Sequence, residues 1–242
     1  MRRLLFDIET SPNLGFFWQT GREIDIDTDS IVQERAIICI CWKWAKDKRV
    51  FTLTWDKGKD KKMIKKFVKV MEQADEIVAQ NGDRFDIKWL RTRCIYHRIP
   101  MSPRVISIDT LKETRKLFKF NSNRLDYVGQ YLGVGQKGKT GGFDTWKDIV
   151  LHNDPVAMRR MIKYCKQDVV LLERVWDVIN PYVAAKLHYG KYSNECPECG
   201  KPRLRKVKER LLSSGVRRYE MKCTVCGKYC TITKNKLKMK IL

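Results

Sequence analysis

Residues 4–10 constrain the fold more than any other part of the sequence, because an apolar run leads directly into two carboxylates. Asp7 and Glu9 are two positions apart. Side chains alternate between the faces of a β-strand, so both carboxylates are expected on one face, with Phe6 and Ile8 on the other. Neighbouring carboxylates repel each other unless a cation lies between them, and Mg²⁺ prefers oxygen ligands. The segment predicts a strand carrying part of a metal site; the alternative is a strand that ends in solvent.

Length and composition are those of a globular protein with a polyanionic partner. The chain has 242 residues, 43% of them hydrophobic, which is enough for one large core and a small second domain. The longest apolar run, residues 36–42, is too short to cross a bilayer, and the charged first strand is not typical of a secretory signal. We therefore expect a cytoplasmic protein without a membrane partner. The formal charge of +22 favours nucleic acid over an anionic membrane surface.

The order of the predicted elements indicates a mixed α/β sheet with helices on its faces. Strands are expected at residues 4–10, 36–45, 49–55, 76–80 and 105–108. Helices are expected at residues 59–73, 83–95, 110–118 and 124–132, and from Pro155 to about Ile179, with Asp109 as the cap of the third. Phe16, Phe17 and Trp18 either stack on nucleic-acid bases or fill the rim of the core. Cys39 and Cys41 alternate with isoleucines and are interpreted as core residues.

Two further acidic motifs follow in the chain. Asp86 lies in the first turn of a predicted helix and would face the carboxylates of the first strand, unless it only balances the helix dipole. Asp83 is interpreted as the N-cap of that helix. Tyr164 and Asp168 share one face of the long helix, beside apolar residues. A carboxylate entering a buried stretch needs a partner such as a metal, whereas Tyr164 taken alone is explained as a core tyrosine.

In this order, Asp7-x-Glu9, the segment from Asn81 to Asp86, and Tyr164-x3-Asp168 resemble the motifs of the DEDD superfamily of 3′–5′ exonucleases. The resemblance covers about residues 1–185. It implies a DnaQ-like, ribonuclease H-like mixed sheet flanked by helices, and the tyrosine indicates the DEDDy branch. The surrounding residues, 11–13 and 139–143, are similar to those of small stand-alone members of bacterial and phage origin.

The resemblance implies that Asp7, Glu9, Asp86 and Asp168 bind two Mg²⁺ or Mn²⁺ ions, and that Tyr164 positions the attacking water. Four carboxylates offset the charge of two such ions. We assign substrate binding to Thr10, Asn81, Phe85, Lys137 and Lys139. The expected activity is 3′–5′ exonuclease action on single-stranded DNA. An exoribonuclease acting on RNA and a non-catalytic nucleic-acid-binding protein are the alternatives, and whether a protein partner exists stays open.

Residues 133–140 match the P-loop pattern of nucleotide-binding proteins letter for letter. That pattern binds phosphates only where a strand precedes it and a helix follows it. Here a helix is expected before the segment, and Gly141 and Gly142 after it disfavour a helix. We therefore expect no nucleotide cofactor, and we interpret the segment as a basic loop whose Lys137 and Lys139 contact the substrate backbone.

Two Cys-x2-Cys knuckles, separated by 23 residues, predict a tetrahedral zinc site. Their ligands are Cys196, Cys199, Cys223 and Cys226. Strands expected at residues 204–207, 218–222 and 229–233 make the segment resemble a zinc ribbon with one structural zinc. An iron–sulfur cluster is the weaker alternative because the spacing is that of neither common ferredoxin motif. Cys230 is interpreted as a spare cysteine.

The ribbon segment differs in charge from the rest of the chain. Residues 190–242 contain 15 lysines and arginines and four acidic residues. We therefore predict an exonuclease domain at residues 1–189 and a basic zinc-ribbon domain at residues 190–242. Phosphate contacts are expected from Arg203, Arg205, Lys206, Arg217, Arg218 and the lysines of the tail. A purely structural or protein-docking ribbon is the alternative.

Overall fold

A five-stranded mixed sheet forms the centre of the computed structural model, which describes residues 2–19, 21 and 26–233. Its strands are β1 (Arg3–Thr10), β4 (Ile37–Trp44), β5 (Phe51–Thr54), β6 (Glu76–Ala79) and β7 (Ser107–Asp109). They lie in the order β5-β4-β1-β6-β7. The β1–β4 and β4–β5 pairs are antiparallel, and the β1–β6 and β6–β7 pairs are parallel. This arrangement confirms the predicted fold class.

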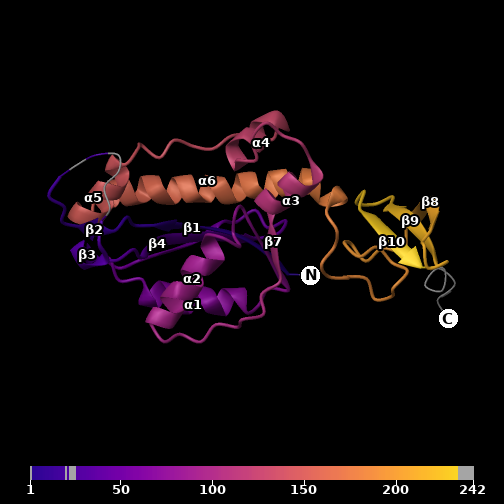
Figure 1. Cartoon of the computed structure of the whole chain (residues 1–242), viewed down its shortest axis with the longest axis horizontal. Coiled ribbons are helices and arrows are strands. Elements are labelled where there is room, and N and C mark those ends of the chain that lie inside the picture. Colours follow the sequence, from indigo (N-terminus) through magenta and orange to yellow (C-terminus); the bar gives the residue numbers. More distant parts are fainter. Residues whose placement is uncertain (1, 20, 22–25, 234–242) are drawn as a thin grey trace.

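Helices cover both faces of this sheet. Its helices are α1 (Lys61–Met71), α2 (Asp86–Tyr96), α3 (Thr110–Leu117), α4 (Leu125–Tyr131), α5 (Asp144–His152) and α6 (Pro155–Ile179). Helices α1 and α2 lie on one face and the long α6 lies on the other (Figure 1). Helix α6 begins as predicted, because Pro155 suits a first helical turn and Asp154 caps it by accepting the N–H of Val156. The sequence analysis did not predict α5.

The register of β1 decides which side chains face α6. Phe6 packs on the opposite face, with its ring centroid 5.4 Å from that of Phe67 on α1. Asp7 pairs with Cys41 and Glu9 pairs with Cys39, so these four residues share the α6 face. Both cysteines are fully buried, as predicted. The two carboxylates therefore lie between the sheet and its long covering helix.

Asp60 connects three elements at the other face. Its carboxylate accepts two hydrogen bonds from the Arg93 guanidinium on α2, at 2.7 and 2.9 Å, and one from the N–H of Ile37 on β4, at 3.1 Å. The Asp60 side chain is fully buried. A buried charge in protein is stable when it is paired and hydrogen-bonded in this way. The contact holds the start of α1 against α2 and the start of β4.

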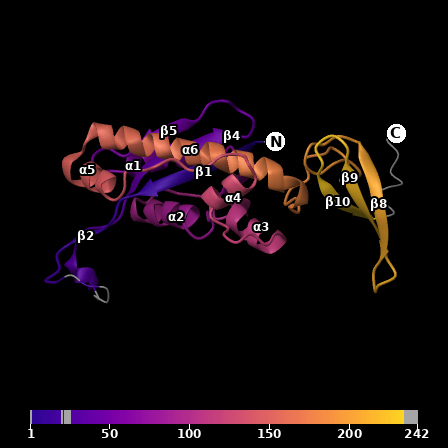
Figure 2. The same ribbon diagram turned by 90° about the horizontal axis from the view of Figure 1, so that it is seen from above.

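A two-stranded arm stands away from the main sheet (Figure 2). It consists of β2 (Leu14–Gly15) and β3 (Ile31–Gln33), which follows the short 3₁₀ helix η1 (Thr28–Ser30). Phe16, Phe17 and Trp18 lie beside β2 and are exposed, Trp18 completely. The interpretation that they fill the rim of the core was wrong, because the arm carries them away from it. Base stacking by these rings stays a prediction.

A second, three-stranded sheet follows α6 and the 3₁₀ helix η2 (Asn180–Tyr182). It contains β8 (Leu204–Leu211), β9 (Arg217–Cys223) and β10 (Tyr229–Thr233), in the order β10-β9-β8. Tyr219, Met221 and Ile232 form its small core, and Cys230 packs against them. The predicted basic tail beyond residue 233 lies outside the described residues. Within the described part of the chain, no helix combines the length and the apolar character needed to cross a membrane.

Candidate functional site

Three carboxylates from distant parts of the chain meet between β1 and α6. Asp7, Glu9 and Asp168 each offer one oxygen, and these oxygens all lie within 4.8 Å of one another. Asp86 lies beside this group rather than within it. It is the first residue of α2, and its Oδ1 accepts the N–H of Ile8 at 3.1 Å, so β1 connects it to the group. The structure thus brings three of the four predicted carboxylates into one cluster and places the fourth next to it.

The environment of this acidic cluster disfavours negative charge. Burial, followed by repulsion from Asp86 and the other carboxylates, raises the pKa of Asp7 well above its ordinary value. Burial also raises the pKa of Glu9 to about 8 and that of Asp86 to about 7. Asp7 Oδ2 and Asp168 Oδ1 are buried and accept no hydrogen bond from any described residue. Carboxylates in such a position need protons or cations, and unpartnered oxygens fit a hard divalent ion.

Lys137 supplies one positive charge to the cluster. Its Nζ lies 2.6 Å from Asp168 Oδ2 and donates a hydrogen bond to the Tyr164 hydroxyl at 2.9 Å. Burial disfavours the charged form of Lys137, but the neighbouring Asp168 carboxylate raises the pKa of Lys137 above its ordinary value. Burial raises the pKa of Tyr164 to about 12, so its hydroxyl keeps its proton near neutral pH. Tyr164 and Asp168 therefore share a helix face, as predicted, and meet at one ammonium group.

The loop that carries Lys137 is the segment with the P-loop pattern. Helix α4 precedes it, as predicted, and the next helix is α5. Asp126 on α4 anchors the loop by accepting the Lys137 N–H at 2.7 Å. At Gly138, an added Cβ would lie 2.1 Å from Oε1 of Gln167 on α6, so a larger residue there would require the Gln167 side chain to move. The sequence indicated that Lys137 contacts the substrate, but it did not indicate that the Lys137 ammonium reaches Asp168.

The second motif forms a tight turn between β6 and α2. Asp109, at the end of the neighbouring strand β7, accepts the N–H of Asn81 at 3.0 Å and that of Asp83 at 3.3 Å. It also caps α3, as predicted, through the N–H groups of Leu111 and Lys112. The prediction that Asp83 caps α2 was wrong. The helix begins three residues later, at Asp86, and the Asp83 carboxylate instead binds Ser107 Oγ and Lys112 Nζ, each at 2.6 Å.

The structure also places the other residues assigned to substrate binding. The carbonyl of Thr10, at the end of β1, accepts the indole N–H of Trp146 at 3.0 Å. Asn81 has a positive φ of 60°, a conformation that asparagine tolerates better than most residues. Phe85 packs partly buried at the start of α2, and Lys139 is exposed. Their contact with a substrate stays a prediction.

Comparison with known protein families matches residues 24–180 to the RNase_H superfamily. The chain belongs to the RNase_H superfamily. The matched residues include Asp86, Tyr164 and Asp168, whereas Asp7 and Glu9 precede the match. A comparison with curated proteins finds no match.

Among solved structures, this RNase_H superfamily chain is similar to the family B DNA polymerase from the hyperthermophilic archaeon Pyrobaculum calidifontis. The TM-score is 0.56 and the sequence identity is 21%. The similarity covers 75% of this chain and 25% of the polymerase chain, so this chain spans about a quarter of the polymerase length. At this identity the similarity shows the fold alone, and it agrees with the mixed sheet described above.

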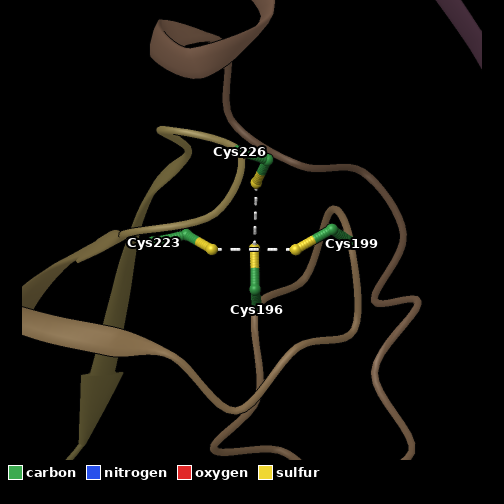
Figure 3. Close-up of side chains that lie close together, drawn as sticks. All are labelled: Cys196, Cys199, Cys223 and Cys226. Carbon is green, nitrogen blue, oxygen red and sulfur yellow. Dashed lines mark hydrogen bonds between the residues drawn. The ribbon is translucent and has the colours of Figure 1, made fainter.

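Beyond the residues matched to the RNase_H superfamily, four cysteines converge as predicted (Figure 3). The Sγ atoms of Cys196 and Cys226 are 3.6 Å apart, and those of Cys199 and Cys223 are 3.7 Å apart. A tetrahedron with metal–sulfur bonds of about 2.3 Å has sulfur–sulfur edges of about 3.8 Å. The four thiols therefore have the spacing of a four-cysteine metal site. Cys230 is not part of this group.

The first cysteine knuckle contacts the start of β1 in the RNase_H superfamily fold. Glu198 lies between Cys196 and Cys199, and its Oε1 accepts a hydrogen bond from the Arg3 guanidinium at 2.8 Å. Arg3 is 5% exposed and also pairs with Glu76. Its guanidinium lies 5.1 Å from the centroid of the Trp176 ring on α6. This cysteine knuckle is therefore joined to the strand that carries Asp7 and Glu9.

The second knuckle contacts the end of α6. Lys228, two residues after Cys226, is 1% exposed and donates hydrogen bonds to the carbonyl and the side-chain oxygen of Asn180, at 2.8 and 2.7 Å. Tyr229 stacks on Tyr182 of η2, with ring centroids 6.1 Å apart. The sequence analysis did not single out Lys228 or Glu198. Both contacts join residues that are far apart in the chain, 48 positions for Lys228 and 195 for Glu198, so no local pattern could have indicated them.

Proposed function

We propose that this protein is a 3′–5′ exonuclease of the DEDDy type, dependent on two divalent metal ions and acting on single-stranded DNA. The observation that carries the proposal is the cluster of Asp7, Glu9 and Asp168, with oxygens within 4.8 Å of one another and Asp86 beside them. The order of the three motifs and membership of the RNase_H superfamily support it. In choosing DNA rather than RNA, the proposal follows the DNA polymerase that shares this fold.

In this proposal, Asp7, Glu9, Asp86 and Asp168 hold two Mg²⁺ or Mn²⁺ ions. Bound divalent ions lower the pKa of an attacking water and stabilise the leaving 3′ oxygen. Tyr164 orients that water through its hydroxyl, and it does not act as a base because its pKa is about 12. Lys137 holds Tyr164 and Asp168 in place and presents its ammonium group to the phosphate that is cleaved.

The proposal is tested with end-labelled single-stranded DNA, duplex DNA and RNA, each incubated with Mg²⁺, with Mn²⁺ or with EDTA. Stepwise shortening from the 3′ end of single-stranded DNA, lost in EDTA, is the expected result. Preferential degradation of RNA would identify an exoribonuclease instead. Binding of all three nucleic acids without cleavage under any condition would identify a non-catalytic binding protein and contradict the proposal.

Thermal stability should respond to pH and divalent ions in a defined direction. The pKa values of about 8 for Glu9 and about 7 for Asp86 lie above the ordinary values. A carboxyl group whose pKa is raised in the folded state stabilises the fold fully only at pH values below its pKa in the unfolded chain. This stabilisation is lost as the pH rises through the pKa of the folded state. Without added divalent ions, Tm should be lower at about pH 8.5 than at about pH 5.5, and Mn²⁺ should raise Tm more at the higher pH. The buffer for these measurements contains no chelator, so that a zinc ion held by the C-terminal cysteines is not removed.

The matched control for this measurement is the Glu9→Gln/Asp86→Asn double variant, which lacks both titrating groups. Its Tm should depend less on pH, and Mn²⁺ should raise it less. The interpretation of the cluster as a metal site would be wrong if the double variant and the wild type showed the same pH dependence and the same response to Mn²⁺.

The Lys137→Met variant tests the role of the loop. Methionine has a similar length and no charge, so the variant loses the contacts to Asp168 and Tyr164 and leaves the loop backbone unchanged. We expect kcat to fall about 10- to 100-fold, the range seen when a group that orients metal-site residues is removed. The Lys139→Met variant removes an exposed lysine of the same loop that is assigned to substrate binding, so it is expected to raise KM and to keep kcat. Equal kcat values in the two variants would contradict this role for Lys137.

For the C-terminal segment, we propose one structural zinc ion held by Cys196, Cys199, Cys223 and Cys226 in a zinc-ribbon domain at residues 190–242. The sulfur spacing and the three-stranded sheet support this proposal. Of the five predicted phosphate-binding cations, Lys206 and Arg217 pair with Glu209. Arg203, Arg205 and Arg218 form no ion pair with a described carboxylate, so we assign the phosphate contacts to these three.

A further inference from the structure

Six aromatic rings form a connected series from α4 to the C-terminal sheet. Each ring is 5.2–6.2 Å from the next, measured between centroids. The series, here called the aromatic track, consists in spatial order of Tyr127, Tyr131, Phe120, Phe118, Tyr182 and Tyr229. Aromatic pairs at such distances are common in protein cores. This series differs because it lies at the surface.

Two rings of the aromatic track are mostly exposed. Tyr131 is 67% exposed and Tyr182 is 59% exposed, and the other four rings are partly buried. A packing role explains partly buried rings such as Phe118 and Phe120, which contact the main core. It does not explain why the large rings of Tyr131 and Tyr182 lie in solvent. Exposed rings supported by partly buried ones provide firm flat surfaces on which another flat group can stack.

Positive charge accompanies the aromatic track. Residues 112–124, which include Phe118 and Phe120, contain five lysines and arginines and one acidic residue. All five of these cations are exposed, and Lys112 pairs with Asp83. The other four form no ion pair with a described carboxylate; they are Arg115, Lys116, Lys119 and Arg124. Aromatic rings interspersed with unpaired cations are the combination that binds single-stranded nucleic acids, through base stacking and phosphate contacts.

The far end of the track opens into a cleft beside the C-terminal sheet. The cleft has a volume of about 710 Å³, and Tyr182 and Tyr229 line it together with Lys186, Arg210 and Arg218. Arg210 is paired with Glu220, whereas Arg218 has no ion-pair partner among the described residues. In both ribbon views, α3 and α4 lie alongside the half of α6 that leads to the C-terminal sheet (Figures 1 and 2).

The near end of the track adjoins the residue that anchors the Lys137 loop. Asp126 precedes Tyr127 and holds the backbone of Lys137, whose ammonium contacts Asp168. Asn123, just before α4, accepts a hydrogen bond from Gln80 at 2.9 Å, and Gln80 adjoins the second acidic motif. The aromatic track therefore connects the segments that form the proposed active site with the C-terminal sheet.

We propose that the aromatic track binds the single-stranded part of a polynucleotide, with bases stacked on Tyr131 and Tyr182 and phosphates bound by the neighbouring cations. Stacking requires unpaired bases, so the track excludes a duplex. A strand bound there reaches from the cleft to the acidic cluster. This deepens the proposed function, because it makes long single strands the preferred substrate class; binding itself does not depend on catalysis.

Binding is measured by fluorescence anisotropy with a labelled oligothymidylate of about 20 nucleotides, long enough to span the track, in buffer without divalent ions, where no cleavage occurs. Tyr131→Ala and Tyr182→Ala are each expected to weaken binding about 5- to 150-fold, the range for loss of one base-stacking contact. Tyr131→Phe and Tyr182→Phe keep the ring and should bind like the wild type. The control is Tyr96→Ala, which removes a 69% exposed tyrosine from α2 on the opposite side of the sheet. It should leave the affinity unchanged.

A second readout separates the track from the active site. Hydrolysis of the p-nitrophenyl ester of thymidine 5′-monophosphate in Mn²⁺ should be the same in all tyrosine variants, because this substrate is too short to reach the track. If the wild type cleaves neither this ester nor DNA, the proposed function fails, and the anisotropy still tests the track. The proposal is overturned if both alanine variants keep wild-type affinity for the single strand, or if they lose affinity for duplex DNA equally. An equal loss with an oligouridylate of the same length supports a track that does not distinguish DNA from RNA.

Discussion

The Asp7→Asn variant is expected to lose nuclease activity by at least about 100-fold, because even groups that only orient metal ligands contribute about 10- to 100-fold to metal-site function. Asp7 belongs to the acidic cluster itself. An asparagine side chain has the same shape but carries no negative charge. It can therefore keep the packing between β1 and α6 while it removes one of the charges that the two ions require.

The Asp7→Asn variant should keep or gain thermal stability although it loses activity. Burial and repulsion raise the pKa of Asp7 well above its ordinary value, so the ionised carboxylate destabilises the folded chain when no divalent ion is present. In buffer without divalent ions at about pH 8, the Asp7→Asn variant should have a Tm equal to or higher than that of the wild type. Calorimetry and the single-stranded DNA assay measure the two effects on the same preparation.

The matched control is Asp83→Asn, a change in the second motif at a residue that lies outside the acidic cluster and binds Ser107 and Lys112. This variant should keep most of its activity. Wild-type activity in Asp7→Asn, or an equal loss in both variants, would show that the cluster is not the active site.

The Cys223→Ser variant is expected to lose its zinc and the structure of the C-terminal sheet. A segment of this size has a core of only a few residues and depends on its metal for folding. The larger RNase H-like part of the chain should also lose stability, because Arg3 on β1 loses Glu198 as a partner. Breaking a buried ion pair costs about 3–5 kcal/mol, and about 3 kcal/mol lowers the Tm of a chain of this size by about 6–12 °C.

Zinc content per chain, limited proteolysis and Tm measure these effects. The control is Cys230→Ser, which changes a cysteine of the same sheet outside the four-cysteine group and should keep one zinc ion and the wild-type Tm. A Cys223→Ser protein that retained zinc, or whose nuclease part melted at the wild-type temperature, would contradict either the zinc site or its connection to β1. The Glu198→Gln variant distinguishes the zinc site from its connection to β1, because it removes the ion pair between Glu198 and Arg3 and leaves all four thiols in place.

Local patterns in the sequence were sufficient for much of the site. The alternation of β1 placed Asp7 and Glu9 on one face, and the helical spacing placed Tyr164 and Asp168 together. The capping role of Asp109 and the start of α6 at Pro155 follow from chemistry within a few residues. The Cys-x2-Cys spacing predicted the four thiols that converge. Within each strand, helix turn or cysteine knuckle, the groups concerned are neighbours in the chain, and backbone geometry sets their relation.

Only the tertiary structure decided how these local units face one another. Lys137 reaches Asp168 because α4 packs on α6 and anchors the loop through Asp126. Asp83 does not cap α2 because β7 brings Ser107, and α3 brings Lys112, within hydrogen-bond distance of its carboxylate. The aromatic track joins rings from four separate segments. Such contacts arise from the packing of distant elements, and the periodicity of a single strand or helix carries no information about them.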